Sequence, residues 1–281
     1  MSEPLLSIVI ANYNYGRYLE DAIKSVLNQD VGDKVELIIC DAESTDNSVD
    51  IIKKYTEKIA WWCSEKDGGQ SEAFNKGFAH ARGKYLTWLN ADNILVNGCL
   101  AKIIKEFELH PECEWFTGNF FRFTEDGKVI EIGWGPRLLP NFLQTVHQPV
   151  AVYGPTTFFS KKIYEQVGRI KEYQHFMMDA DLWIRFIMAG IKQRRIGTMC
   201  WAFRMHSDSK TAEYGNHKLS PEQRAKFEAE RRKSLMDTGF RTSKFNSFAI
   251  KVWRILDGSF LKRLYLLRTF KYFDPKECYG L

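Results

Sequence analysis

The chain alternates between short, nearly unbroken apolar runs and segments in which apolar residues recur every three or four positions. The short runs are typical of strands buried on both faces of a sheet, and the second pattern is typical of amphipathic helices. The expected strands of the first half are residues 6–11, 35–40, 59–63 and 85–89, and a predicted helix follows each of them. Four such repeats predict an α/β fold with a doubly wound, mainly parallel sheet.

The second half of the chain has a less regular pattern. We expect a helix at 98–110, a strand at 115–119, a hairpin of 120–124 and 129–132, a strand at 156–160, a helix from Asp179 to Gly190 and a strand at 196–205. Residues 133–152 are irregular, and their Trp134, Phe142 and His147 are either acceptor-site residues or ordinary packing residues. Residues 221–236 predict a charged helix.

Polar residues stand at the carboxyl end of each of the first four expected strands. They are Asn12 and Tyr13, Asp41 and Ser44, Asp67, and the run Asn90-Ala91-Asp92-Asn93. The carboxyl ends of parallel strands meet on one rim, where open α/β sheets bind their ligands. Each residue by itself is also typical of an ordinary turn or helix cap. The shared rim favours a functional role for Asp41 and Asp92.

The stretch from Ser64 to Asn93 adds an ordered series of signals. Asp67-Gly68-Gly69 predicts a turn, and Ser71 is expected to cap a helix that Gly83 ends. The polar run that closes the stretch offers oxygen ligands. Hard cations such as Mg²⁺ prefer oxygen ligands and can share them with a diphosphate.

A second informative segment surrounds two aspartates, Asp179 and Asp181. Asp179 is expected to cap a helix whose inward face carries Leu182, Trp183 and Phe186. Acids are also stabilising at any helix N-terminus because of the helix dipole. Residues two positions apart do not share a helix face, so we expect the two aspartates to have different roles.

Together these motifs resemble the core of the family 2 glycosyltransferases. That family carries Asp-x-Gly, then Ala-x-Asn-x-Gly, then a strand that ends in an Asp-x-Asp metal motif, and the matching segments here begin at Asp67, Ala73 and Asn90. The strand ends Ala11-Asn12-Tyr13-Asn14 and Asp41-x-x-Ser44-x-Asp46 are also similar to family patterns. The resemblance covers roughly residues 5–210.

The resemblance implies a GT-A fold and an inverting transfer of a sugar from a nucleotide sugar, of UDP type, to an acceptor hydroxyl. The acceptor is expected to be a glycan or a lipid-linked sugar in cell-surface polysaccharide or glycolipid synthesis. The resemblance also implies that Tyr13 and Asp41 contact the base and that Asp92 holds Mn²⁺ or Mg²⁺. His206, in the segment Arg204-x-His206, is either a contact to the metal or diphosphate or a structural residue.

The same resemblance places the catalytic base at Asp179, with Asp181 in support. The full set of residues expected to bind the nucleotide sugar is Asn12, Tyr13, Asp41, Ser44, Asp67, Asn75, Asn90, Ala91, Asp92 and Asp181. The chain departs from many relatives at Asn90 and Asn93, which leave Asp92 as the only acid of the metal motif. Met178 stands before the base, where many relatives have a glutamate.

Other functions compete with this interpretation. No GxGxxG or GxxxxGK[ST] motif follows the first strand, which weakens dehydrogenase and P-loop readings. A nucleotidyltransferase on a similar sheet requires a Gly/Lys-rich triphosphate loop near the N-terminus, and none is visible. A sugar-nucleotide-binding protein without catalysis keeps the fold, and Asp179 is the feature that favours an enzyme over it.

Composition bears on the compartment. The apolar fraction of 44% and the charged fraction of 27% are those of an ordinary globular protein. Six scattered cysteines without CxxC pairs predict reduced thiols in a cytosolic protein. We expect neither a signal peptide nor a membrane span, and therefore a cytoplasmic location.

Charge is unevenly distributed along the chain, whose net charge is +5. Between Arg231 and Phe273 eleven Lys and Arg stand against two Asp. We expect a catalytic domain at 1–210 and a basic helical extension at 211–281, which either packs on the domain or meets anionic lipid at the inner face of the cell membrane. No nucleic-acid partner is expected.

Overall fold

The computed structural model describes residues 3–133, 156–207, 220–239, 268 and 271–275, and within them the chain forms one mixed sheet. Its order is β3 (Trp61–Ser64), β2 (Val35–Asp41), β1 (Leu6–Asn12), β4 (Tyr85–Asn90), β8 (Thr157–Ser160), β6 (Trp115–Thr124), β9 (Gln193–Met205) and β5 (Ile94–Leu95), with β7 (Val129–Gly133) paired to β6. Strands β3, β2, β1 and β4 are parallel, and β8 is antiparallel to both of its neighbours. The expected α/β sheet is confirmed.

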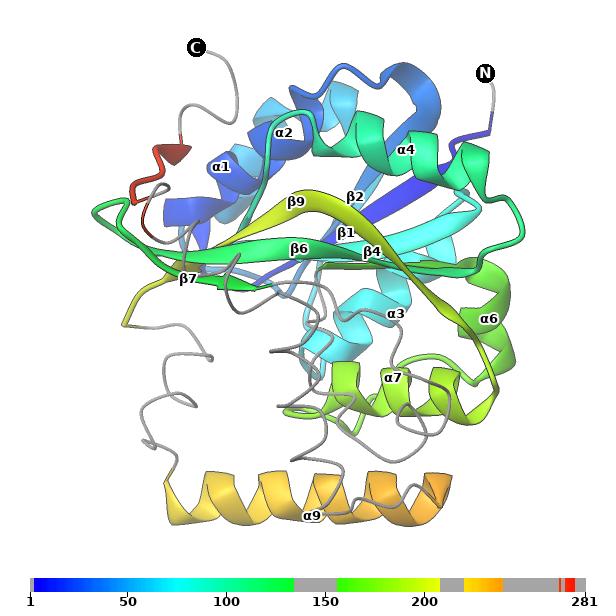
Figure 1. Ribbon diagram of the computed structural model, residues 1–281. Helices are drawn as coiled ribbons and strands as arrows, with labels where there is room; N and C mark the ends of the chain where they lie inside the picture. The colour runs from blue at the N-terminus through cyan, green and yellow to red at the C-terminus, as the bar shows by residue number, and fades with distance from the viewer. Residues whose placement is uncertain (1–2, 134–155, 208–219, 240–267, 269–270, 276–281) are drawn as a thin grey trace.

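Helices cover both faces of this sheet (Figure 1). One face carries α1 (Gly16–Leu27), α2 (Ser48–Lys54) and α4 (Cys99–Leu109), and the other carries α3 (Gln70–His80), α6 (Lys161–Gln166) and α7 (Met178–Met188). Short 3₁₀ turns lie at Gly32–Lys34 and Thr56–Lys58. A separate helix, α9 (Pro221–Thr238), lies beyond α7.

Strand β1 shows why the apolar runs form the centre of the fold. Its alternate side chains enter the two opposite cores: Ile8 and Ile10 pack with α1 and α4, and Val9 packs with α3. Helix α3 approaches closely at Gly77, where a Cβ would lie 2.3 Å from Cγ1 of Val9. A larger residue at position 77 is therefore expected to push α3 away from the sheet.

Several local predictions are corrected by the structure. Residues 115–124 form one strand, so the expected strand at 115–119 and the first arm of the hairpin are continuous. Ser71 does not cap α3: the helix begins at Gln70 after Gly69, and it ends at His80 before Gly83 is reached. Helix α7 begins at Met178, so Asp179 lies in its first turn and is not its cap.

The C-terminal part of the chain contacts the main body at two places. Helix α9 confirms the predicted charged helix and packs against α7. Farther on, the amide of Phe273 donates to the carbonyl of Gly127 at 2.7 Å, and the Phe273 ring is buried beside Phe121 and Phe123.

Some expectations lie outside the described residues. These are the suggested acceptor-site residues Trp134, Phe142 and His147 and the part of the expected basic helical extension from 240 to 267. The domain boundary at residue 210 stays a prediction. None of the helices in the part of the chain that the structure describes is long and apolar enough to cross a bilayer.

Candidate active site

The carboxyl ends of β1 and β2 meet in a hydrogen-bonded cluster centred on Asp41. Parallel register places Asn12 beside Asp41, and the Asn12 amide donates to Oδ1 of Asp41 at 2.6 Å. The hydroxyls of Ser44 and Ser64 also donate to this carboxylate, each at 2.6 Å. Asp41 is only 1% exposed. The predicted rim therefore exists, and a base that reaches Asp41 has to share or replace these donors.

The loop after β1 presents an aromatic ring beside that cluster. Asn14 adopts a left-handed conformation (φ 55°), its amide N–H donates to Oγ of Ser44, and its side chain accepts from the amide N–H of Thr45. Tyr13, one residue earlier, is 59% exposed. Hydrogen bonds thus hold the loop while the Tyr13 ring stays open to a planar ligand.

The turn at Asp67 lies between β3 and α3 and is held to the end of β4 by a hydrogen bond from Gln70. Oδ1 of Asp67 accepts the amide N–H of Gly69 at 2.8 Å, and Gly69 has the positive φ that favours glycine. The neighbouring Gln70 side chain donates to Oδ1 of Asn90 at 2.9 Å. Burial raises the pKa of Asp67 above its ordinary value despite the hydrogen bond from Gly69.

Asp92 and His206 lie together after β4 and β9. Nε2 of His206 is 3.1 Å from Oδ2 of Asp92, and the imidazole packs against the ring of Tyr18 at a centroid distance of 4.7 Å. Oδ1 of Asp92 is buried and has no hydrogen-bond partner among the described residues. A carboxylate with such an oxygen and an adjacent imidazole fit a Mn²⁺ ion or a similar cation. The described residues contain no cluster of three or more His, Cys, Asp or Glu that could hold a metal alone.

Arg204 organises this corner, and sequence reasoning assigned it no role of its own. Its side chain donates to the carbonyl of Asp92 at 3.3 Å and to the carboxylate of Asp21 at 2.8 Å. Its amide N–H donates to Oδ1 of Asn93, which is 3% exposed. Asn93 therefore holds the turn against β9, and this bond explains an amide there. No local pattern links residues 111 positions apart.

The two aspartates of α7 have different surroundings. Asp181 is buried, its Oδ2 accepts from Nε of Arg185 at 2.8 Å, and its Oδ1 accepts from the hydroxyl of Ser234 at 2.6 Å. Asp179 is half-buried, and its Oδ1 accepts the amide N–H of Ala180. Protein groups engage both oxygens of Asp181, which favours a supporting role for it over a ligand contact.

Two other predicted site residues, Asn75 and Ala91, contact the protein interior. The amide of Asn75 donates to the carbonyl of Ile170 at 3.0 Å and accepts from the hydroxyl of Tyr164, so it ties α3 to the segment before α7. Ala91 is buried. The roles of both residues toward a nucleotide sugar stay predictions.

Comparison with known sequences matches residues 7–168 to the model of the family described as Glycosyl transferase family 2. A relative named as an uncharacterized glycosyltransferase, from a Nostoc species, is 41% identical over 106 residues, which are 37% of this chain and 33% of that protein. Chondroitin synthase of Pasteurella multocida is 26% identical over 73% of this chain and 21% of that protein. The chain thus spans a third or less of the length of these relatives.

Comparison with solved structures identifies the fold. The S. aureus TarS fragment 1–349 in complex with UDP has a TM-score of 0.60 at 14% identity, covering 71% of this chain and 60% of that one. A mannosyltransferase from Pyrobaculum calidifontis, in complex with GDP-Man and Mn²⁺, has a TM-score of 0.56 at 18% identity, covering 75% and 60%. The architecture is the GT-A fold.

Proposed function

The chain belongs to glycosyl transferase family 2, and from that premise we propose that it transfers a sugar from a nucleotide sugar to an acceptor hydroxyl. One observation carries the proposal: the Asp41 cluster and the Asp92–His206 pair lie at the carboxyl ends of strands in one sheet. An open α/β sheet binds its ligand at that edge. The Tyr13 ring and the Asp41 cluster are the proposed site of the base, for which uracil is the candidate.

The diphosphate is assigned to the corner of Asp92 and His206. The oxygen Oδ1 of Asp92 and the imidazole of His206 are the protein ligands proposed for a divalent cation. A bound cation neutralises the charge of the departing diphosphate. Arg204 and Asn93 hold the Asp92 turn against β9, so the carboxylate is oriented before a ligand arrives.

Asp179 is assigned the part of the base. An acceptor hydroxyl is a weak nucleophile until its proton is removed, and a carboxylate within hydrogen-bond reach can remove it as the new bond forms. Asp179 stands in the first turn of a helix from the second half of the chain, and its neighbour Asp181 is engaged by protein groups. Attack from the side opposite the diphosphate inverts the anomeric carbon.

Titration calorimetry with UDP tests the donor and the metal together. We expect wild-type protein to bind UDP more tightly with Mn²⁺ than with EDTA, and Asp92→Ala to lose that difference. Asp33→Ala is the matched control, because Asp33 is exposed in the 3₁₀ turn before β2, at the other end of the strand. Wild-type affinity that EDTA leaves unchanged rules out the metal assignment, and absence of UDP binding rules out UDP as the donor nucleotide.

The acceptor is proposed to be a glycan or lipid-linked sugar met at a membrane surface. Basic residues near an anionic leaflet contribute on the order of 1 kcal/mol each, and the segment from Arg231 to Phe273 carries eleven Lys and Arg. We expect the protein to sediment with anionic liposomes at low salt and a variant with Lys251, Lys262 and Arg263 changed to Gln to sediment less. Wild-type protein that stays in the supernatant contradicts membrane contact.

A further inference from the structure

Helix α9 makes hydrogen bonds to residues 175–181, the segment that carries the proposed base Asp179. From this contact we infer that Glu230 and Ser234 are positioning residues for sugar transfer; the inference rests on the function proposed above. Both lie outside residues 7–168, the part of the chain that matches the family model. They touch no reacting atom in this scheme and act through residues 175–181.

Glu230 binds two backbone N–H groups of this segment. It is 6% exposed, and its carboxylate accepts the backbone N–H groups of His175, at 3.1 Å, and Phe176, at 2.9 Å. A carboxylate that accepts two backbone N–H groups makes charge-assisted bonds, which are roughly twice as strong as neutral ones. Glu230 therefore fixes the backbone immediately before α7 begins.

Ser234 holds the next turn. Its hydroxyl donates to Oδ1 of Asp181 at 2.6 Å, and Arg185 holds the other oxygen of the same carboxylate. Asp179 lies between the two anchors, because residues 175–176 precede it and Asp181 follows it. Movement of either anchor displaces the base.

The opposite side of this segment rests on α3. The hydroxyl of Ser71 donates to the carbonyl of Gln174, and the His175 ring lies 3.5 Å from where a Cβ on Gly69 would stand. Gly69 belongs to the turn of Asp67, on the proposed donor rim. Residues 174–178 therefore lie between the Asp67–Gly69 turn and α9. The position of α9 thus sets the distance from Asp179, the proposed base, to the proposed donor rim.

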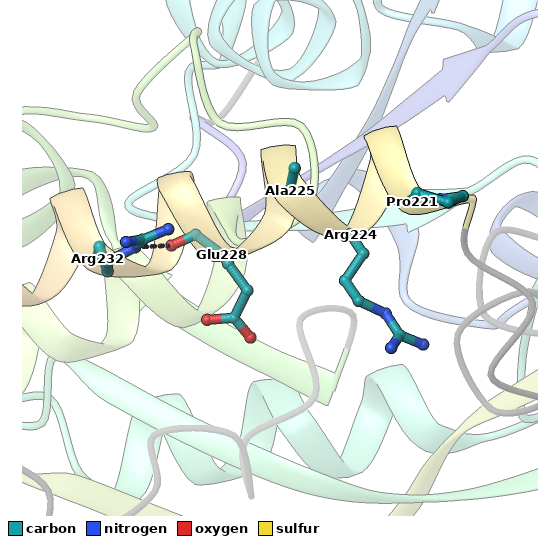
Figure 2. A pocket seen from close by; sticks show the side chains of 5 residues that line it. All are labelled: Pro221, Arg224, Ala225, Glu228 and Arg232. Carbon is teal, nitrogen blue, oxygen red and sulfur yellow. Dashed lines mark hydrogen bonds between the residues drawn. The ribbon is translucent and has the colours of Figure 1, made fainter.

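The side of α9 that contacts residues 173–181 carries different residues from the opposite side. At 100° per residue, one side of the helix carries Phe227, Glu230, Ser234 and Asp237. Phe227 contacts the ring of Phe176, and Glu230 accepts from the amide N–H of Phe176. Ser234 donates to Asp181, and Asp237 accepts from the hydroxyl of Tyr173. On the other side, a pocket of about 550 Å³ is lined by Pro221, Arg224, Ala225, Glu228 and Arg232. Figure 2 shows these five side chains. Glu228 extends on that other side, so it serves as a matched control for the loss of one glutamate from the same helix.

The test uses the full chain and measures release of UDP from UDP-GlcNAc and UDP-glucose, with water as the acceptor. We expect Glu230→Ala to lower kcat by roughly 10- to 100-fold, since a displacement of about 1 Å can cost 10²-fold, and to leave the KM of the donor within about twofold. Glu230→Gln keeps one acceptor oxygen and is expected to recover part of the loss. Ser234→Ala should lower kcat less than Glu230→Ala, and Glu228→Ala should match wild type.

Amide hydrogen exchange shows whether the segment itself responds. Peptides that cover residues 173–181 should exchange faster in Glu230→Ala than in Glu228→Ala. If the wild-type protein is active and Glu230→Ala has the same kcat as Glu228→Ala, the inference is overturned and the proposed function is left intact. A parallel loss of kcat and UDP affinity in Glu230→Gln also overturns it, because that result indicates general unfolding. A wild type that binds these UDP-sugars but releases no UDP from either of them overturns the proposed function itself.

Discussion

The proposed donor rim and the α7–α9 contact both hold carboxylates in place, but by different means. On the rim, the backbone register of β1 and β2 brings Asn12 beside Asp41, and neighbouring loops add the hydroxyls. At α7, side chains from the separate helix α9 reach Asp181 of α7 and the loop before it, 53 to 55 residues away in the sequence. The rim is therefore a product of the fold's topology, and the position of the proposed base depends on a few hydrogen bonds that topology does not supply.

The largest effect is expected at Asp179, the half-buried member of the α7 pair. Asp179→Asn keeps the size of the side chain and the hydrogen bond to the Ala180 amide but cannot take a proton. We expect kcat to fall by a factor on the order of 10² to 10⁴, the usual range for a general base, with unchanged UDP affinity and melting temperature. Release of UDP from a UDP-sugar measures kcat.

Measuring UDP affinity in one variant of each region distinguishes their proposed roles. Asp41→Asn, on the rim, should weaken UDP binding, whereas Asp179→Asn should not. Near-normal turnover in well-folded Asp179→Asn removes Asp179 from the mechanism. It also leaves the binding of a sugar nucleotide without catalysis as the remaining function.

The next effect concerns stability and the buried partner, Asp181. Its ion pair with Arg185 is 2.8 Å long, and the two side chains are 4% and 12% exposed. Removing one member of a buried pair costs about 3–5 kcal/mol, and Asp181→Asn should fall near the lower end because the amide oxygen still accepts from Ser234. Urea unfolding measures the loss.

A second pair of the same spacing provides the control. Arg169 and Glu165 also stand four residues apart, at 2.7 Å, but their side chains are 55% and 40% exposed. Exposed pairs contribute about 0–1 kcal/mol, so Glu165→Gln should change the free energy of unfolding little. Equal losses in the two variants contradict the structural role of Asp181.

The same contrast explains what the sequence could predict. The alternating strands and helices and the shared rim follow from periodicity and from the direction of parallel strands, and the two-residue spacing of Asp179 and Asp181 predicts their different surroundings. The bonds of Arg204 to Asp21 and of Glu230 to the amide of Phe176 join residues 183 and 54 positions apart. Such contacts leave no local pattern, because a single charged residue on a helix or a strand is most often solvated.

The smallest expected effect is on the pH dependence of stability, to which Asp67 and Asp46 of the rim contribute with opposite sign. Burial raises the pKa of Asp67, so folding is opposed by its charge once the pH rises above the ordinary value near 4. Burial also acts on Asp46, but hydrogen bonds from Ser48 and Gly16 outweigh it and lower the pKa. Asp46 therefore contributes stability above that ordinary value and loses it as the pH falls through its lowered pKa.

The two Asn variants should consequently shift the melting temperature in opposite directions. Relative to wild type, Asp67→Asn should gain more at about pH 7 than at about pH 3, and Asp46→Asn should lose more at about pH 7 than at about pH 3. The Gly69 amide can still donate to an Asn at position 67, so the comparison isolates the charge. Parallel shifts in the two variants contradict the assignment. Opposite shifts mean that the charge of Asp67 opposes folding, which is expected of a carboxylate kept for a ligand and not for stability.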